Sequence, residues 1–154
     1  VLTSVRVMTE EGEIMELPAE ELGLGYRTSI IPEKRYIVLG AVISLTEGKK
    51  EEIKAQMDDL RQKRVSKQPL EYPSAGSTFK RPEGYFAGKL IQDSGLKGFT
   101  IGGAQVSEKH SGFVINKGNA TAADVMELIR QVTAKVKEDT GVTMVPEVKQ
   151  IGEF

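Results

Sequence analysis

Hydroxyls and fixed positive charges gather in one short segment, residues 72–82, with the sequence YPSAGSTFKRP. Small residues let a backbone come close to a ligand, and the two prolines that bracket the segment restrict its conformation. Ser77 and Thr78 supply the hydroxyls, while Lys80 and Arg81 supply the cations. This combination predicts a rigid loop that holds an anionic substrate beside a reactive hydroxyl.

A hydrolase is one alternative chemistry, with Ser77 as nucleophile and His110, the single histidine, as base. Ser77 does not lie in a nucleophile elbow, because no glycine follows two residues later. Gly102 and Gly103 lack the spacing and the lysine of a dinucleotide-binding or phosphate-binding loop. With no cysteine, one histidine and no calcium-loop spacing of carboxylates, we expect no metal site.

The bulk composition is that of an ordinary globular domain. The 154 residues are 39% hydrophobic and 28% charged, and the net charge is -1. This balance gives no overall attraction to nucleic acid or to an anionic membrane. The absence of cysteine fits a cytoplasmic protein, and no apolar run approaches the roughly 20 residues of a membrane span. No signal-peptide pattern opens the chain. Because it begins at Val1 within a predicted strand, we expect a fragment or a processed product.

The N-terminal part is predicted to be mostly β structure. Residues 1–8 alternate apolar and polar side chains, residues 10–12 supply a turn, and residues 13–17 return, which predicts a hairpin. Residues 18–22 suit one helical turn with proline at its first position. Residues 35–45 are mostly apolar, so we expect a strand buried on both faces.

A densely charged helix is predicted for residues 49–64. Its apolar side chains form one narrow stripe at helical spacing: Ile53, Met57 and Leu60. Asp59 and Lys63 stand one turn apart and are expected to pair. A basic helix for nucleic acid is the alternative, but acidic residues alternate with the basic ones, so we predict a surface helix with a thin contact face.

The C-terminal part mixes helices and strands. Residues 85–94 suit a short helix that Gly95 ends, and residues 99–106 and 112–116 are predicted as two strands. Residues 142–151 are predicted as a final strand.

A second C-terminal helix carries the strongest apolar pattern in the chain. Thr121 followed by Asp124 is typical of a capping box, and Gly141 is expected to end the helix. Its apolar stripe consists of Val125, Leu128, Ile129, Val132 and Val136. The fold class is therefore α+β in two parts, joined near the charged helix.

Several ordered segments of the chain resemble the UDP-N-acetylenolpyruvoylglucosamine reductases, the flavin enzymes of peptidoglycan precursor synthesis. They are residues 25–29, 72–82, 86–92, 98–104 and 146–152. The resemblance covers almost the whole chain. It implies that residues 1–46 are the C-terminal part of the second FAD-binding domain, residues 47–64 a connecting helix, and residues 65–154 a small substrate-binding domain with an antiparallel sheet and flanking helices.

The resemblance also implies roles for individual residues. Ser77 stands where the family has the serine that protonates the substrate carbanion, and Glu147 matches the glutamate that assists at the same carbon. Arg27 matches a third active-site residue, an arginine. The implied substrate-binding residues are Lys67, Lys80, Arg81 and His110. The implied cofactor-binding residues are Tyr26 and Lys149.

The implied reaction is the reduction of UDP-N-acetylglucosamine enolpyruvate to UDP-N-acetylmuramate, with FAD as cofactor and NADPH as co-substrate. The family enzyme works in the cytoplasm for cell-wall synthesis, cell shape and division. We expect a full-length monomer with no nucleic-acid or membrane partner. The resemblance starts after the family's N-terminal FAD-binding domain, so we expect that domain and its glycine-rich loop to lie outside these 154 residues. This chain alone is therefore expected to bind flavin weakly or not at all and to be inactive.

The sequence departs from the family pattern at several positions, and the candidate residues also have simpler structural interpretations. Arg81 stands where one branch carries asparagine, Lys149 where arginine is common, and residues 45–48 run directly into the helix without a long loop. Without the resemblance, Ser77 would be interpreted as a turn hydroxyl, and Glu147 as a solvated strand residue. A non-catalytic module that binds UDP-sugars is the alternative function.

Overall fold

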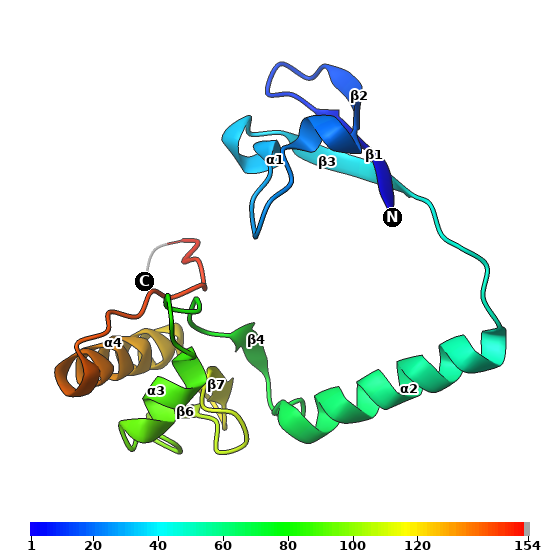
Figure 1. The fold of residues 1–154 in the computed structure, drawn as a ribbon. Coiled ribbons are helices and arrows are strands. Elements are labelled where there is room, and N and C mark those ends of the chain that lie inside the picture. The colour runs from blue at the N-terminus through cyan, green and yellow to red at the C-terminus, as the bar shows by residue number, and fades with distance from the viewer. Residues whose placement is uncertain (153–154) are drawn as a thin grey trace. The chain divides into compact units, whose positions relative to one another are not determined.

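The computed structural model describes residues 1–152, which divide into two compact units, residues 1–53 and residues 54 onward. Each unit carries its own antiparallel sheet with helices, so the predicted α+β class is confirmed. Figure 1 shows the order of the elements along the chain.

The first unit is built around the predicted hairpin. Strands β1 (Leu2–Met8) and β2 (Ile14–Pro18) pair antiparallel. Strand β3 (Ile37–Ile43) pairs antiparallel with the other edge of β1, which gives the order β2-β1-β3. The predicted turn after β2 is a 3-10 helix, η1 (Ala19–Leu22), and α1 (Ile30–Glu33) follows it. The small core contains Val5, Val7 and Leu22.

The prediction that β3 is buried on both faces is wrong for this chain. Val42 is 52% exposed and Ile43 is 59% exposed, and Ile37, Val38 and Leu39 are also exposed. The reason is that β3 is an edge strand of its sheet, and nothing within the first unit covers its apolar side chains. An uncovered edge of this kind is a pairing surface for another strand.

The predicted charged helix is α2 (Lys50–Lys67), and none of its residues is buried. Lys63 contacts Asp59 at 2.6 Å, so the predicted pair is confirmed. Its apolar stripe of Ile53, Met57 and Leu60 is exposed. Among residues 1–152, no helix is both long and apolar enough to cross a membrane.

The second unit carries a four-stranded antiparallel sheet in the order β4-β7-β6-β5. The strands are β4 (Ser74–Ser77), β5 (Thr100–Ile101), β6 (Ala104–Val106) and β7 (Phe113–Asn116). Helix α3 (Ala87–Asp93) packs on helix α4 (Ala122–Thr140), and α4 packs on β5 and β6. Four of the five predicted stripe residues of α4 are fully buried in this core: Leu128, Ile129, Val132 and Val136.

The predicted ends of α4 are confirmed. The Thr121 side chain accepts from the Asp124 N–H at 3.1 Å, and the Asp124 carboxylate accepts from the Thr121 N–H at 2.9 Å. Gly141 ends the helix in the left-handed region with φ +73.

Two strand predictions need correction. Residues 99–106 are not one strand but a hairpin of β5 and β6, because Gly102 turns the chain with φ +53. Residues 142–151 do not form a strand; they make one isolated bridge, between Pro146 and Phe79. Pro146 has no N–H to donate, which limits how far the ladder can extend.

Candidate active site

The segment predicted as a rigid loop around Ser77 is in fact a bulged strand. In β4, Ser74 pairs with Ile115 and Ser77 pairs with Phe113. Between these two pairs, β4 has one more residue than β7. Gly76 absorbs the bulge with φ +86, and its N–H donates to the Ser74 hydroxyl at 3.4 Å. A bulge bends a strand and redirects its side chains. Here it leaves Ser77 exposed at the end of β4.

The neighbouring hydroxyl, Thr78, has a structural role. Thr78 is 2% exposed, and its hydroxyl accepts the Val114 N–H at 3.0 Å. Its own N–H donates to the Gly112 carbonyl at 2.9 Å. Thr78 therefore fixes the end of β4 against β7, and Ser77 is the hydroxyl of this pair that faces solvent.

Glu147 is brought to the same place by backbone pairing. The Glu147 N–H donates to the Thr78 carbonyl at 2.8 Å, and the Lys80 N–H donates to the Val145 carbonyl at 2.8 Å. Residues 145–147 therefore run alongside residues 78–80. The pairing therefore brings together two segments that are distant in the sequence. One segment carries the predicted residues Ser77 and Lys80, and the other carries Glu147.

Arg81 and His110 are each held by specific contacts in this unit. The Arg81 Nε–H donates to the Tyr85 carbonyl at 3.2 Å, and its guanidinium carbon lies 4.1 Å from the centroid of the Phe86 ring. His110 accepts the Gly112 N–H at Nδ1, at 3.1 Å, which leaves the ring proton on Nε2. Its ring meets that of Phe113, the partner of Ser77, edge to face at 5.0 Å.

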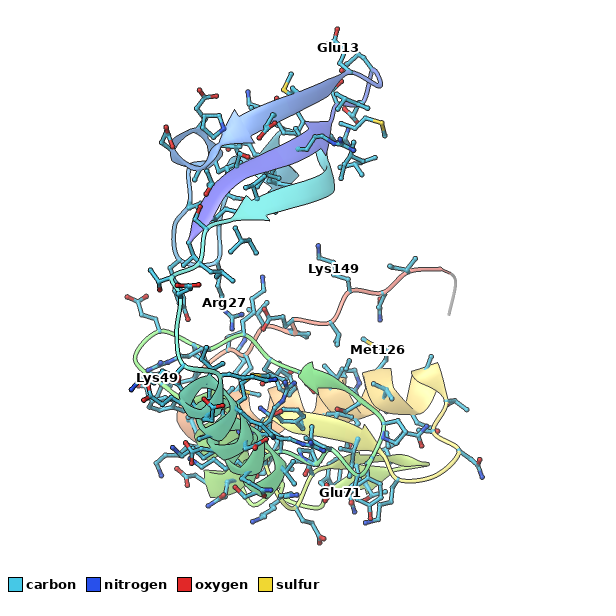
Figure 2. All side chains as sticks on the ribbon, turned by 90° about the vertical axis from the view of Figure 1, so that its right-hand side faces the viewer. Glu13, Arg27, Lys49, Glu71, Met126 and Lys149 are labelled. Atoms are coloured by element: carbon cyan, nitrogen blue, oxygen red, sulfur yellow. The ribbon has the colours of Figure 1, made fainter. Side chains whose placement is uncertain are left out.

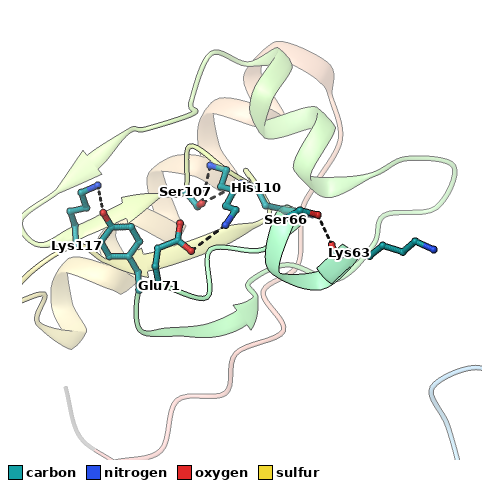
Figure 3. A network of polar contacts seen from close by, with 8 residues as sticks. Lys63, Ser66, Glu71, Ser107, His110 and Lys117 are labelled. Atoms are coloured by element: carbon teal, nitrogen blue, oxygen red, sulfur yellow. Dashed lines mark hydrogen bonds and ion pairs between the residues drawn. The ribbon is translucent and has the colours of Figure 1, made fainter. Parts of the chain in front are cut away.

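A polar network fixes the loops on either side of this group (Figure 3). Lys109 contacts Glu71 at 3.3 Å, and the Ser107 hydroxyl accepts the N–H groups of Lys109 and His110. The pKa of Glu71 is lowered, first by a hydrogen bond at its own backbone and then by Lys109. Sequence reasoning missed Glu71, Ser107 and Lys109, because their pairing depends on the folded positions of separate loops.

Lys117 and Tyr72 fix the start of the Ser77 segment in a similar way. Lys117 donates to the Tyr72 hydroxyl at 2.9 Å, and its ammonium lies 4.5 Å from the ring centroid. The hydrogen bond to Tyr72 is the main reason why the pKa of Lys117 is raised. The contact joins the residue before Pro73 to the end of β7.

A cavity of about 370 Å³ lies against the same strand. Its lining is mostly apolar and includes Ser74, Ala75, Thr78, Ile115, Ile129 and Val148. Ala75, Thr78 and Val148 are close neighbours in sequence of Ser77 and Glu147, so the cavity adjoins the segment that carries the candidate chemistry. Residues 1–152 contain no group of three or more histidine or acidic side chains that could hold a metal ion.

The remaining predicted residues lie outside this group. Tyr26 and Arg27 belong to the first unit, in a tight turn closed by hydrogen bonds between Gly25 and Thr28 at 3.1 and 3.3 Å. Arg27 has φ +58, and Tyr26 is 83% exposed. A non-glycine residue in the left-handed region is a costly conformation that often marks a functional turn. The sequence alone does not reveal the left-handed backbone conformation of Arg27.

Lys67 and Lys149 are exposed. Lys67 is the last residue of α2, and Lys149 lies in the segment that follows the bridge at Pro146. Figure 2 shows the side chains of Arg27 and Lys149.

Comparison with known families places the second unit in context. Residues 68–151 match the model of a family described as the C-terminal domain of UDP-N-acetylenolpyruvoylglucosamine reductase. That match covers more than half of the chain and includes Ser77, Arg81, His110 and Glu147.

Whole proteins show the same similarity. The chain is 62% identical over 154 residues to a UDP-N-acetylenolpyruvoylglucosamine reductase of Agathobacter rectalis and covers 49% of it. It is 58% identical to one from Caldanaerobacter subterraneus, of which it covers 51%. The crystal structure of the Thermus caldophilus UDP-N-acetylenolpyruvylglucosamine reductase superposes with a TM-score of 0.79 at 37% identity, over 96% of this chain and 52% of that one. The chain therefore spans about half the length of the relatives it matches.

Proposed function

The chain belongs to the UDP-N-acetylenolpyruvoylglucosamine reductase family, and from this premise we propose that it supplies the proton donor and the substrate-binding half of such a reductase. The proposed reaction converts UDP-N-acetylglucosamine enolpyruvate to UDP-N-acetylmuramate for peptidoglycan synthesis in the cytoplasm. One observation carries the proposal: backbone pairing sets Glu147 beside Thr78, directly after the exposed hydroxyl of Ser77.

The reaction adds hydride to one carbon of the enolpyruvyl double bond and a proton to the other. Reduced FAD, when bound, supplies the hydride, and NADPH restores its electrons. The carbon that receives the proton first carries negative charge, which it shares with the adjacent carboxylate. We assign the proton to the Ser77 hydroxyl. A serine hydroxyl is a weak acid, so its position against the substrate carbon matters more than its acidity.

The charges near Ser77 suit the same step. Lys80 lies three residues after Ser77, beyond the end of β4, and we assign its ammonium to the negative charge that develops on the substrate. We assign Arg27 to the substrate carboxylate, because a guanidinium pairs with a carboxylate through two parallel hydrogen bonds. Glu147 then steers the proton toward Ser77 or the substrate carbon.

The rest of the substrate is an anionic nucleotide sugar. We assign Lys67, Arg81 and His110 to it. Arg81 offers a planar fork to phosphate oxygens, and Lys67 offers a point charge. The Nδ1 of His110 is used by the Gly112 N–H, so His110 offers the Nε2–H as a donor.

The described residues offer single candidates for flavin contacts but no complete flavin site. The exposed ring of Tyr26 is suited to stack on an aromatic system, and the Lys149 ammonium to pair with a negative group. The glycine-rich loop that would hold the pyrophosphate of FAD has no counterpart in this sequence. We therefore assign most flavin contacts to an N-terminal half, and residues 1–46 to the end of the second FAD-binding domain.

The exposed strand β3 supports a partner of this kind. Its apolar side chains lie on an unpaired sheet edge, and the matched relatives are about twice as long as this chain. We propose that the N-terminal half of the same protein covers β3, and that the complete protein is a monomer.

The test is to add the enolpyruvyl substrate and NADPH to the full-length protein and follow NADPH oxidation together with the product. We expect both only when the substrate is present. A full-length protein that binds UDP by calorimetry and never reduces the substrate would instead be a UDP-sugar-binding module.

A further inference from the structure

Phe86 is a large aromatic residue that is 61% exposed. One of its faces is occupied by the Arg81 guanidinium, whose central carbon lies 4.1 Å from the ring centroid. An arginine stacked on an aromatic ring gains electrostatic attraction from the ring face. The pair thus links two exposed side chains on either side of a short turn.

The turn between them is fixed at both ends. The Tyr85 N–H donates to the Pro82 carbonyl at 3.1 Å, and Gly84 has φ +75. The Phe86 carbonyl accepts the Lys89 and Leu90 N–H groups at 3.0 and 3.1 Å, so Phe86 is bound to the first turn of α3. The backbone of Phe86 is therefore fixed by contacts that do not involve Arg81.

The guanidinium is also held along one edge. Its Nε–H donates to the Tyr85 carbonyl at 3.2 Å, and its central carbon lies over the Phe86 ring. The edge formed by Nη1 and Nη2 is then the one available for a bidentate contact. A long side chain normally loses rotamer freedom when it binds an anion, and here much of that loss has already occurred.

We propose that Phe86 is a positioning residue that orients Arg81 as a preformed fork for the diphosphate of the UDP-sugar. This inference rests on the proposed function. Arg81 lies four positions after Ser77, and an extended chain spans at most about 14 Å over that interval. The enolpyruvyl group and the diphosphate are carried by one sugar ring, so their separation lies well within this upper limit.

The test compares full-length protein and its variants, with UDP as the probe. Phe86→Leu removes the ring, Phe86→Tyr keeps it, and Arg81→Lys keeps the charge without the fork. We expect Phe86→Leu to weaken UDP binding about threefold to fivefold, as for loss of an exposed cation–π contact. It should raise KM more than it lowers kcat, and Phe86→Tyr should restore both.

A double-mutant cycle tests whether Phe86 acts through Arg81. Phe86→Leu should change the UDP Kd by less than about twofold when Arg81 is already lysine. An equal effect in both backgrounds would mean that the ring contacts the nucleotide directly, and it would overturn the inference. If Phe86→Leu fails to fold, the Arg81 Nε–H resonance of the wild type decides: it must shift during a UDP titration, and a constant signal refutes the proposal.

The outcomes separate this inference from the proposed function. Normal turnover by the wild type together with an unchanged UDP Kd in Phe86→Leu would overturn the role of Phe86 alone. Weaker UDP binding in Phe86→Leu, in a protein that never reduces the enolpyruvyl substrate, would support the role of Phe86 and refute the reductase.

Discussion

The Glu147 N–H and the Thr78 carbonyl meet at 2.8 Å, in a short pairing between two distant segments of the chain. The contact uses backbone atoms of Glu147, so it does not depend on which side chain stands at position 147. Thr78 is itself held to β7 through its buried hydroxyl. The positions of Ser77 and Glu147 are therefore set by the same strand pairing.

Removal of the Ser77 hydroxyl should separate the two halves of the proposed reaction. Ser77→Ala in the full-length protein should lower reduction of the enolpyruvyl substrate by about 10²–10⁴-fold, the usual cost of losing a positioned proton donor. Flavin reduction by NADPH should survive, as stopped-flow absorbance can measure. Thr100→Ala removes an exposed hydroxyl from β5, at the opposite edge of the same sheet; it is the control and should stay near the wild type. Near-normal substrate turnover in Ser77→Ala would show that another group protonates the carbon.

Glu147→Gln tests the carboxylate without disturbing the fold. The backbone N–H that bonds Thr78 remains, so the melting temperature should stay close to that of the wild type. We expect kcat to fall by about tenfold or more, because an amide can neither hold the charge nor accept the proton. Steady-state kinetics and thermal melts on one preparation check both points. A large loss of stability with unchanged kcat would give Glu147 a structural role only.

Signals within one helix were the most predictable part of this fold. Thr121 and Asp124 predict the start of α4 because a capping box acts over a single turn. The buried stripe follows from the 3.6-residue period, and Asp59 and Lys63 pair because they stand one turn apart. Each of these predictions needs only neighbouring residues.

Long-range pairing was where sequence reasoning failed. The apolar character of β3 predicts burial, but burial depends on what covers the strand, and no described residue does so. Gly103, in the turn of the hairpin that replaces the predicted strand, has no room for a side chain, because a Cβ there would clash with the Gly118 carbonyl oxygen. That close approach is a property of the folded sheet.

In the candidate site, too, the contacts between distant residues could not be predicted from local sequence patterns. Ser77 and Glu147 were assigned through family resemblance, because no local pattern brings residues so far apart in sequence together. The stacking of Arg81 on Phe86 escaped prediction because Phe86 was placed inside a helix, whereas it precedes the first turn of α3.

Acid should remove one stabilising contact of α4 in a defined pH range. Arg130 is the main cause, and Gln131 a further one, of the lowering of the Glu127 pKa from 4.5 to about 2. A carboxyl whose pKa is lower in the folded protein stabilises it above its ordinary pKa, and this stabilisation is lost as the pH falls toward the folded value. The difference in melting temperature between the wild type and Glu127→Gln should therefore be present at pH 7 and vanish near pH 2. A difference that persists at pH 2 would have to come from packing.

The apolar edge of β3 should behave differently in the isolated chain and in the full-length protein. Val42→Lys places a charge on the edge, so it should reduce any concentration-dependent association of the isolated chain in sedimentation experiments. If the N-terminal half covers β3, the same change should destabilise the full-length protein by about 2 kcal/mol, because a buried valine is replaced by a charge. Met57→Lys, on the exposed stripe of α2, is a matched control and should change the full-length protein little. Equal, small effects of both substitutions on the full-length protein would mean that β3 remains uncovered there.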